Sequence, residues 1–424
     1  MYSVEYVPRL IDRFLDDLMS GLPAIALDGA KGVGKTATAG RRAGTTYSLD
    51  RRADFLSVDH DPEIVTQSTG TVFLDEWQLV PTVWDVVRRA VDNGAPPGRF
   101  LLAGSATVPP GTRIHSGAGR TVRTLMRPMS LPERGVESPA VSLAELLQGT
   151  RPAVGGHTTF ATADYVAEIM ASGFPGICAR PASLRPELLS SYVAQIVEHD
   201  VGEAGAAVRR PATLRAWLAA YGAATGTCAS YASIIRAATP GEEAVPARDT
   251  AQAYRELLTR LWILDPVPAW YPVFSHLKRL GQTPKHHLVD PALAATLVGV
   301  DEASLLRGKG PLRPDTTFYG SLFESLAAQT VRVLAQASRA TVSHLRTQGG
   351  EHEVDLIVER PDHAVVAIEV KASPLVRPAD VRNLNWLEAE VGEAVVDKVI
   401  LTAGDRAYRR PDGVAVVPLA LLGV

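Results

Sequence analysis

The sequence predicts an α/β protein in which a parallel sheet covered by helices is followed by a mostly helical region and a second α/β unit. Three observations predict this. Short apolar runs that are typical of buried strands alternate with helix-like segments in residues 1–135. A glycine-rich stretch, residues 29–36, joins the first of these strands to a helix. Near the C-terminus, two strand-like runs, residues 354–358 and 365–371, carry acidic side chains.

Composition sets limits on function. The chain has 424 residues, of which 46% are hydrophobic and 21% charged, so several domains with their own cores are expected. A formal net charge of -3 gives no overall basic field, and any nucleic-acid contact must therefore be local. Cys178 and Cys228 predict neither a disulfide framework nor a zinc site, which favours a reducing, cytoplasmic setting. We expect no signal peptide, because residues 1–6 show no basic region followed by an apolar core. We expect no membrane partner, because no apolar run reaches about 18 residues.

The first elements follow from periodicity. Residues 4–22 predict a helix, because apolar side chains recur at helical spacing from Ile11 to Leu18. Gly21-Leu22-Pro23 ends this helix. Helical segments separate the strands that come next, so a parallel sheet covered on both faces is expected. The five predicted strands are residues 24–27, 47–50, 71–76, 100–104 and 121–126.

The glycine-rich stretch fits the phosphate-binding pattern G-x-x-x-x-G-K-[ST]. Glycines allow backbone N–H groups to surround phosphate oxygens, and the helix N-terminus adds its own unpaired N–H groups. Lys35 is predicted to reach the β- and γ-phosphates of ATP, and the Thr36 hydroxyl to ligate Mg²⁺. The alternative is a glycine-rich turn that fits by accident. The predicted nucleotide-binding residues are Gly29, Ala30, Lys31, Gly32, Val33, Gly34, Lys35 and Thr36.

Two acidic residues end the strand at residues 71–76. An acid at the end of a neighbouring strand holds the metal in proteins with this loop, so Asp75 is the predicted metal ligand. Glu76 is predicted to polarise the water that attacks the γ-phosphate. Many surface strands also end in acids, which is the alternative. Ser105, at the end of the next strand, is the predicted sensor of the γ-phosphate or water; otherwise it is a turn serine.

An arginine that stabilises transition-state charge, acting in cis or from a neighbouring subunit, is expected after this serine. Arg113, Arg120 and Arg123 are the candidates, with Arg120 chosen as the catalytic one. No sequence rule separates the three, and a solvated arginine is the alternative for each.

These motifs resemble the P-loop ATPases of the AAA superfamily that carry a C-terminal DUF4143 region. The resemblance covers residues 24–205. We expect an ATPase core at 1–135, followed at 136–205 by a connector, from its Pro-, Gly-, Ser- and Thr-rich composition, and by a helical segment of the size expected of a lid. Two residues depart from it: Ser172 stands where a glycine is usual, and His199 where an arginine is usual. The matching stretches are the phosphate loop, Leu74-Asp75-Glu76-Trp77-Gln78, Ala103-Gly104-Ser105, Gly119-Arg120, Arg127-Pro128-Met129-Ser130-Leu131-Pro132-Glu133 and Gly173-Phe174-Pro175.

Residues 206–300 predict a winged-helix-like domain. Three short amphipathic helices, near residues 211–221, 227–237 and 250–262, precede a hairpin-like segment. Residues 207–287 hold ten Lys/Arg and five Asp/Glu, a local charge of +5, which favours DNA contact. A module that contacts only protein is the alternative. The family resemblance extends through residues 284–291.

Residues 301–424 resemble the restriction-endonuclease-like core after a linker at 301–315. The resemblance implies that Asp355 and Glu369 ligate Mg²⁺, that Lys371 activates water and that Glu324, on a helix, is an auxiliary acid. A solvated strand end is the alternative for these residues.

The full prediction is a P-loop NTPase parallel sheet with a helical lid, followed by a winged-helix-like domain and an α/β restriction-endonuclease-like domain. The predicted function is Mg²⁺-dependent ATP binding and hydrolysis by an AAA-type protein whose C-terminal domains bind, and if active cleave, DNA. The alternative is a nucleotide-operated regulatory switch with a catalytically silent nuclease-like module. A homo-oligomer is a further expectation, without a motif that fixes the number of subunits.

Overall fold

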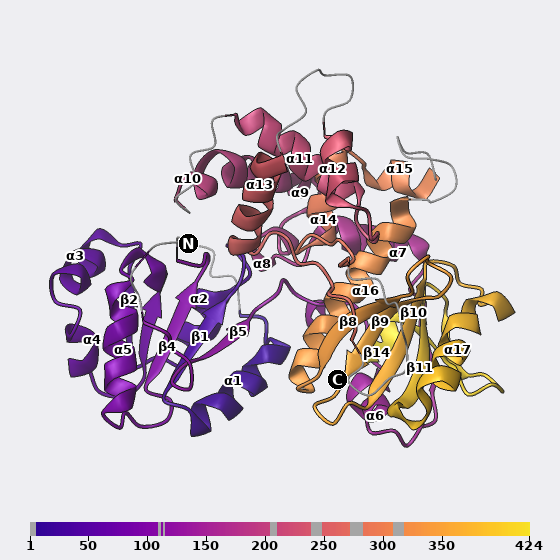
Figure 1. The fold of residues 1–424 in the computed structure, drawn as a ribbon, viewed down its shortest axis with the longest axis horizontal. Helices are drawn as coiled ribbons and strands as arrows, with labels where there is room; N and C mark the ends of the chain where they lie inside the picture. The colour runs from indigo at the N-terminus through magenta and orange to yellow at the C-terminus, as the bar shows by residue number, and fades with distance from the viewer. Residues whose placement is uncertain are drawn as a thin grey trace.

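The structure is a computed structural model that describes residues 6–108, 112, 115–203, 210–238, 248–271, 283–307 and 318–424. Figure 1 shows a region built on a parallel sheet, a region built on a mixed sheet, and a helical region that lies above both. Within the described residues, no helix combines the length and apolarity needed to cross a bilayer.

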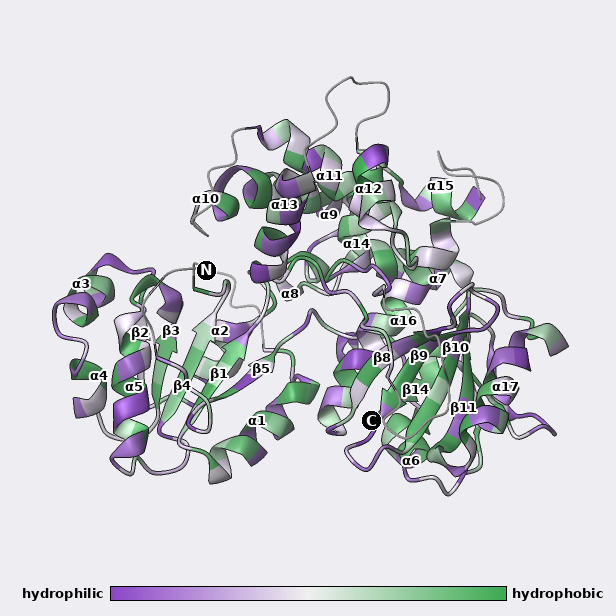
Figure 2. Cartoon of the chain, viewed as in Figure 1, coloured by the Kyte–Doolittle hydropathy of each residue, from purple (hydrophilic) through white to green (hydrophobic). Residues whose placement is uncertain are grey.

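The N-terminal sheet has five parallel strands in the order β2-β3-β4-β1-β5, which confirms the predicted sheet. Its strands alternate between two cores: Ile25 and Leu27 of β1 face one, and Ala24 and Ala26 face the other. Helices therefore cover both faces, as Figures 1 and 2 show. The strands are β1 (Ala24–Asp28), β2 (Thr45–Ser48), β3 (Val72–Asp75), β4 (Phe100–Gly104) and β5 (Val122–Leu125). The helices of this region are α1 (Leu10–Gly21), α2 (Lys35–Gly40), α3 (Arg52–His60), α4 (Ile64–Gln67) and α5 (Thr82–Asp92), with short 3-10 turns at Trp77–Leu79 and Pro132–Arg134.

The helical region contains the three helices predicted for the winged-helix-like domain, now α11, α12 and α13. Isolated antiparallel bridges join Leu264 to Leu288 and Val267 to Lys285 at the base of the predicted hairpin. The hairpin's tip, residues 272–282, lies outside the described residues, so the winged helix stays a prediction. The elements are α7 (Thr162–Ala171), α8 (Pro175–Cys178), a 3-10 turn (Ala182–Leu184), α9 (Arg185–Gln195), a π-helical turn (Ile196–Asp200), α10 (Val201–Glu203), α11 (Pro211–Ala223), α12 (Tyr231–Ala237), α13 (Arg248–Arg260), α14 (Pro291–Val298) and α15 (Glu302–Arg307).

The C-terminal region is a seven-stranded mixed sheet in the order β7-β12-β13-β11-β10-β9-β8. Helix α16 (Phe318–Ala337) packs in the core on one face, and α17 (Arg382–Val391) packs in the core on the other. Part of the linker expected at 301–315 lies outside the described residues. The strands are β8 (Thr341–Arg346), β9 (Glu353–Glu359), β10 (Val365–Lys371), β11 (Val395–Thr402), β12 (Arg406–Arg409) and β13 (Ala415–Pro418); 3-10 turns lie at Pro378–Val381, Gly392–Ala394 and Leu419–Leu421.

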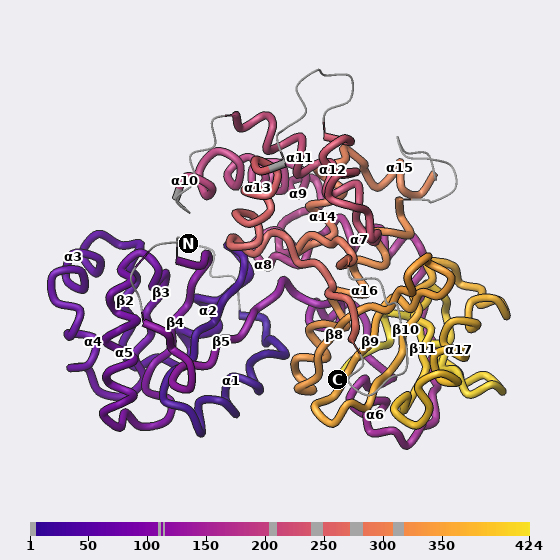
Figure 3. Tube along the Cα trace, viewed as in Figure 1, coloured from indigo at the N-terminus to yellow at the C-terminus, as the bar shows by residue number. Residues whose placement is uncertain are grey.

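The segment expected to be a connector contributes to this C-terminal sheet. Strand β7 (Gly155–His157) pairs with β12 at the sheet edge, and β6 (Val141–Ser142) pairs in parallel with β14 (Leu422–Gly423). Helix α6 (Leu143–Leu147) lies between them in sequence and beside the C-terminal strands in Figure 3. The predicted domain boundaries stay predictions, but residues 141–157 pack with the C-terminal unit rather than with the lid.

A buried ion cluster joins the three regions. Asp265 accepts hydrogen bonds from Arg127, at 2.7 and 3.2 Å, and forms an ion pair with Arg332 of α16 at 2.9 Å. One helical turn further along α16, Gln336 Nε2 donates to Thr124 Oγ1 and to the Leu125 carbonyl of β5. Helix α16 therefore contacts the edge of the N-terminal sheet directly.

Candidate functional site

The phosphate loop runs from the end of β1 into α2 with its glycines in conformations that side chains rarely adopt. Gly34 has φ of 105°. At Gly29, where φ is 152°, an added Cβ would lie 2.3 Å from the Met126 carbonyl oxygen. Side chains are therefore disfavoured at Gly29 and Gly34, and this leaves backbone N–H groups accessible to phosphate oxygens.

Lys35 lies buried under this loop. Its Nζ donates to the carbonyls of Gly29 at 2.7 Å and Ala30 at 3.0 Å. Burial lowers the pKa of Lys35 to about 8, although Glu76 and Asp75 oppose that shift. The hydrogen bonds of the Lys35 ammonium go to neutral carbonyl oxygens, and a phosphate oxygen, which is charged, would form a stronger hydrogen bond with it.

Thr36 and Asp75 form the predicted metal position. Burial raises the pKa of Asp75, while a hydrogen bond from the Thr36 side chain lowers it. Oδ1 of Asp75 is buried and has no hydrogen-bond partner among the described residues. A hydroxyl and a carboxylate oxygen side by side suit Mg²⁺, which takes few protein ligands and completes its shell with water and phosphate oxygens. The residues present therefore fit this ion.

Glu76 is held beside the loop by two neighbours. Its Oε2 accepts from Ser105 Oγ at 2.6 Å and from Gln78 Nε2 at 2.5 Å. Glu76 itself has φ of 53°, a strained conformation for a non-glycine residue and one that is common at functional sites. The structure thus brings together Lys35, Thr36, Asp75, Glu76 and Ser105, as their sequence positions predict.

A cavity of about 460 Å³ opens on this group. Its lining includes the phosphate loop and Glu76, the charged side chains of Arg9, Glu133 and Arg134, and an apolar group. Helix α8, which begins at Pro175 of the Gly173-Phe174-Pro175 stretch, forms one wall of the cavity. Ser172 has φ of 66°, a value that explains why glycine is usual at this position in the resembling family. The apolar wall comprises Val7, Met126, Met129, Pro175, Gly176, Cys178 and Ala179.

The structure places the predicted arginines differently: Arg120 lies away from the loop, whereas Arg123 lies beside the residue that precedes the loop. Arg120 pairs with Asp92 at 2.6 Å, at the edge of the sheet where β5 begins, whereas the phosphate loop follows the other end of β1. Arg123 pairs with Asp28 at 2.8 Å, and Arg113 lies outside the described residues. A role for Arg120 within its own chain lacks support from this geometry. Arg134, which sequence reasoning missed, lines the cavity; its Nη1 pairs with Glu168, and its buried Nη2 has no hydrogen-bond partner within the described ranges.

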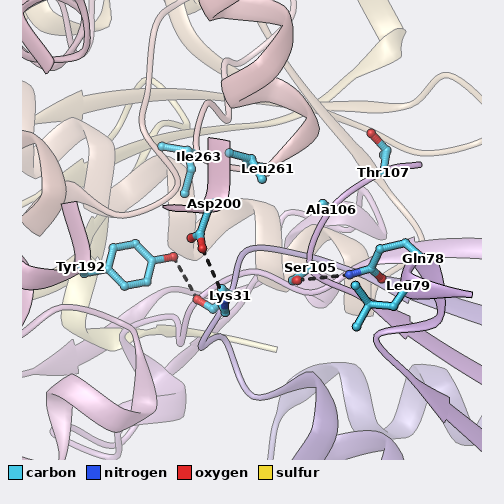
Figure 4. Close-up of a pocket in the computed structure, with 10 residues that line it drawn as sticks. All are labelled: Lys31, Gln78, Leu79, Ser105, Ala106, Thr107, Tyr192, Asp200, Leu261 and Ile263. Carbon is cyan, nitrogen blue, oxygen red and sulfur yellow. Dashed lines mark hydrogen bonds and ion pairs between the residues drawn. The ribbon is translucent and has the colours of Figure 1, made fainter. Parts of the chain in front are cut away.

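The helical region contacts the phosphate loop and the segment after Ser105, and Figure 4 draws the contacts made by the loop residue Lys31. Lys31 forms an ion pair with Asp200 at 3.3 Å, and its carbonyl accepts from Tyr192 Oη at 2.9 Å. Beyond Ser105, Thr107 N donates to the Arg260 carbonyl at 3.1 Å. Sequence reasoning gave no role to Asp200, the residue after His199. The phosphate loop therefore contacts α9 and the π-helical turn after it, and the segment after Ser105 contacts the end of α13.

The predicted C-terminal site is arranged around a lysine. Lys285 Nζ lies 2.8 Å from Asp355, 3.0 Å from Glu324 and 2.9 Å from Glu353. Lys285 is 1% exposed. Burial alone would lower the pKa of Lys285, but the carboxylates raise it well above its ordinary value. Sequence reasoning gave Lys285 no role and missed Glu353.

Glu369 and Lys371 complete this cluster on β10. Lys371 Nζ donates to Glu369 Oε1 at 2.7 Å, while Glu369 Oε2 is buried and finds no hydrogen-bond partner in the part of the chain that the structure describes. Burial and the Asp355 carboxylate raise the pKa of Glu369 to about 8, despite the opposing charge of Lys371. The predicted residues are therefore together, but an ammonium lies where the resemblance implies Mg²⁺. This arrangement does not fit a divalent ion, and the described residues hold no His, Cys, Asp and Glu group suited to one.

Comparison with known families gives matches to three successive parts of the chain. Residues 22–134 match an AAA domain, residues 162–304 match a domain of unknown function, DUF8612, and residues 319–422 match another, DUF4143. The chain carries an AAA domain and a C-terminal DUF4143 region. This confirms the resemblance predicted from the motifs, and ATP binding is the property expected of the AAA domain at the family level. The DUF8612 match spans the predicted lid and winged-helix-like segments together.

Two mycobacterial relatives match more of the chain than the AAA domain alone. The uncharacterized proteins Rv2008c of Mycobacterium tuberculosis and Mb2031c of Mycobacterium bovis are each 25% identical over 314 residues, or 72% of this chain. The match covers 62% of each relative. A solved structure, the Walker-type ATPase PABY2304 of Pyrococcus abyssi, superposes with a TM-score of 0.41 and 14% identity over 68% of this chain and 94% of that one.

Proposed function

We propose that the AAA domain binds and hydrolyses MgATP and that its nucleotide state acts on the helical and DUF4143 regions. The observation that supports this most is the position of Glu76, held by Ser105 beside Lys35, Thr36 and Asp75. A base, a polar sensor, a lysine and a metal position around one bare loop are the parts that phosphoryl transfer to water needs.

Each residue has a distinct task. The triphosphate lies along the loop amides, and Lys35 exchanges its two carbonyl partners for β- and γ-phosphate oxygens. Thr36 and Asp75 would hold Mg²⁺, which would supply charge neutralisation on the phosphates. Glu76 accepts a proton from the attacking water, whose oxygen forms a bond to the γ-phosphorus. The bond between the γ-phosphorus and the β–γ bridging oxygen breaks, and that oxygen leaves as part of ADP. Ser105 keeps the Glu76 carboxylate in place.

The first test is calorimetry with MgATP. The intact chain is expected to bind it, and Lys35→Ala to weaken that binding by at least about tenfold, which is about 1.4 kcal/mol. Thermal unfolding of the nucleotide-free variant controls for misfolding. Equal affinity in both proteins, or no binding heat in the parent, contradicts the proposal.

Action on the other regions is proposed to start at two contacts: the Lys31–Asp200 ion pair and the backbone bond from Thr107 to Arg260. The first contact is made by the phosphate loop itself, and the second by the segment two residues after Ser105. Loss of the γ-phosphate then changes the contacts that the helical region makes with the loop.

For the C-terminal half, we propose DNA as the partner and keep two predicted roles, nuclease and silent binding module. The local charge of +5 over residues 207–287 supports DNA contact. The lysine inside the acid cluster favours the silent module.

Incubation with supercoiled plasmid and Mg²⁺ or Mn²⁺, with and without ATP, separates these roles. The silent module is expected to shift the DNA in a gel without nicking it, with an affinity that falls as salt rises. Nicking that the double change Glu369→Ala and Lys371→Ala abolishes would establish the nuclease instead. Absence of any gel shift would contradict DNA as the partner.

A further inference from the structure

Another cavity lies where β5 of the AAA sheet meets α16 and β8, elements that Figure 1 shows on the facing sides of the two regions. Its volume is about 360 Å³, within the range of roughly 300–1,000 Å³ that small-molecule sites occupy. Four of the described residues that line it are arginines and none is acidic, so we call it the arginine cavity. The arginines are Arg123, Arg127, Arg332 and Arg339.

The walls of the arginine cavity are joined across the two regions. Gln336 Nε2 of α16 donates to Thr124 Oγ1 of β5 at 2.8 Å, and both residues line the cavity. Arg332 of α16 and Arg127, which follows β5, share the carboxylate of Asp265. The cavity is therefore formed in the folded chain before any ligand arrives, and a ligand need not order its walls.

The buried part of the arginine cavity carries an excess of positive charge. Arg127 and Arg332 have one carboxylate, Asp265, between them, so these three groups together keep one positive charge. Burial lowers the pKa of Arg332 to about 10, and the nearby charge of Arg127 adds to that shift. An anion in the cavity would offset this charge.

The other two arginines have donors to offer a ligand. Arg123 Nε donates to Asp28 at 2.8 Å, and Arg339 Nη2 lies 3.5 Å from Asp17. Both arginine side chains are partly exposed, Arg123 by 44% and Arg339 by 61%. A guanidinium carries five N–H donors, and these ion pairs use only some of them. The pair with Asp17 is also weak, because both of its side chains are more than half exposed.

We propose that the arginine cavity binds a small molecule that carries two or more phosphate groups. The planar guanidinium matches phosphate oxygens in shape and in charge. Four guanidiniums can engage more oxygens than the three acceptors of one phosphate group, which is why at least two groups are inferred. Among the described residues, this cavity shares no lining residue with the one at the phosphate loop. The inference therefore goes beyond the nucleotide function and does not depend on it.

Calorimetric titration with sodium pyrophosphate, in the absence of divalent metal, tests the proposal. All proteins carry Lys35→Ala, so that the phosphate loop contributes little to the heat. The parent of this series is expected to bind one pyrophosphate per chain. Arg339→Gln is expected to weaken that binding about tenfold, because it removes a charged donor from the cavity.

Asp17→Asn is expected to act in the opposite direction. It removes the acid that competes with the ligand for Arg339, so pyrophosphate should bind about two- to fivefold more tightly. A purely structural role for Arg339 would not produce opposite changes in the two variants. If Arg339→Gln did not fold, the gain in affinity of Asp17→Asn would decide the question by itself.

Two matched controls separate the cavity from the general surface charge. Arg89→Gln removes a half-exposed arginine that pairs with Glu63 elsewhere on the AAA domain. Asp16→Asn removes the acid next to Asp17 on α1, which pairs with Arg42 instead. Neither change should alter pyrophosphate affinity at about 0.15 M salt, where distant charges are screened. Thermal unfolding of each variant shows that it is folded.

Several results would overturn the proposal. One is the absence of pyrophosphate binding by the Lys35→Ala protein. Others are an unchanged affinity in folded Arg339→Gln or in Asp17→Asn, or an equal loss in Arg89→Gln, which would indicate attraction by surface charge in general. A single-stranded DNA oligonucleotide serves as the second probe. If it bound through Arg339 while pyrophosphate did not bind, the cavity would hold a nucleic-acid backbone and not a small molecule.

Discussion

Glu76→Gln is expected to reduce kcat for ATP hydrolysis by about 10²–10⁴-fold while MgATP affinity changes little. The amide has the shape of the carboxylate and its oxygen can still accept from Ser105 Oγ, so the loop and the cavity keep their form. It cannot accept the proton of the attacking water. Release of phosphate under saturating ATP gives kcat, and calorimetry gives the affinity.

Glu63→Gln is the matched control, since Glu63 is an exposed acid paired with Arg89 outside the site. It should hydrolyse ATP at the parental rate. Parental turnover by Glu76→Gln would show that another group activates the water and would withdraw the role given to Glu76.

Asp265→Asn is expected to cost about 3–5 kcal/mol of stability, because it leaves Arg127 and Arg332 close together with no counter-charge. Both guanidiniums are largely buried, with side chains 11% and 13% exposed, so solvent screens their repulsion only weakly. The three regions meet at this cluster, and the loss should lower the midpoint of denaturant unfolding for the whole chain. Asp92→Asn, at an exposed pair with Arg120, should cost only about 0–1 kcal/mol.

The stabilising effect of Asp265 should depend on pH in a defined direction. Burial opposes ionisation, but the two arginines outweigh it and lower the pKa of Asp265 from 3.8 to about 2. A depressed carboxyl pKa stabilises the fold above the unfolded value and ceases to do so as the pH falls through the folded value. The difference between parent and Asp265→Asn should therefore be constant above pH 5 and shrink between about pH 4 and 2. A difference that instead grew on acidification would contradict the ion cluster.

The sequence predicts local features of this chain better than distant contacts. Buried parallel strands and a glycine loop leave patterns within a few residues, which is why the sheet and the group around Lys35 and Glu76 could be expected. Ser105 could be placed because it ends a strand next to β3. Strand β7 could not be predicted, since Gly155-Gly156-His157 has no strand pattern and is ordered by pairing with β12.

The acid cluster shows the same limit. Strand context identified Asp355 and Glu369, but the ammonium between the acids comes from a residue 70 positions earlier than Asp355. Nothing near Lys285 in sequence signals three carboxylates as partners. Likewise, Arg120 was a candidate catalytic arginine because it comes after Ser105 in the sequence. Since β5 runs parallel to β1, Arg120 lies at the end of the sheet where these strands begin, whereas the phosphate loop lies where β1 ends.

The pairing of β7 with β12, and of β6 with β14, also orders the events of biosynthesis. About 250 residues separate β7 from β12, so at roughly 5–20 residues per second the early strands wait about 12–50 s for their partners. The AAA sheet has all five strands once residue 125 has been made, whereas the pairing of β6 with β14 is completed only once residue 423 has been made. A ribosome that stops before Arg406 would therefore release a chain with a complete nucleotide sheet and two unpartnered segments, a ready substrate for chaperones and proteases.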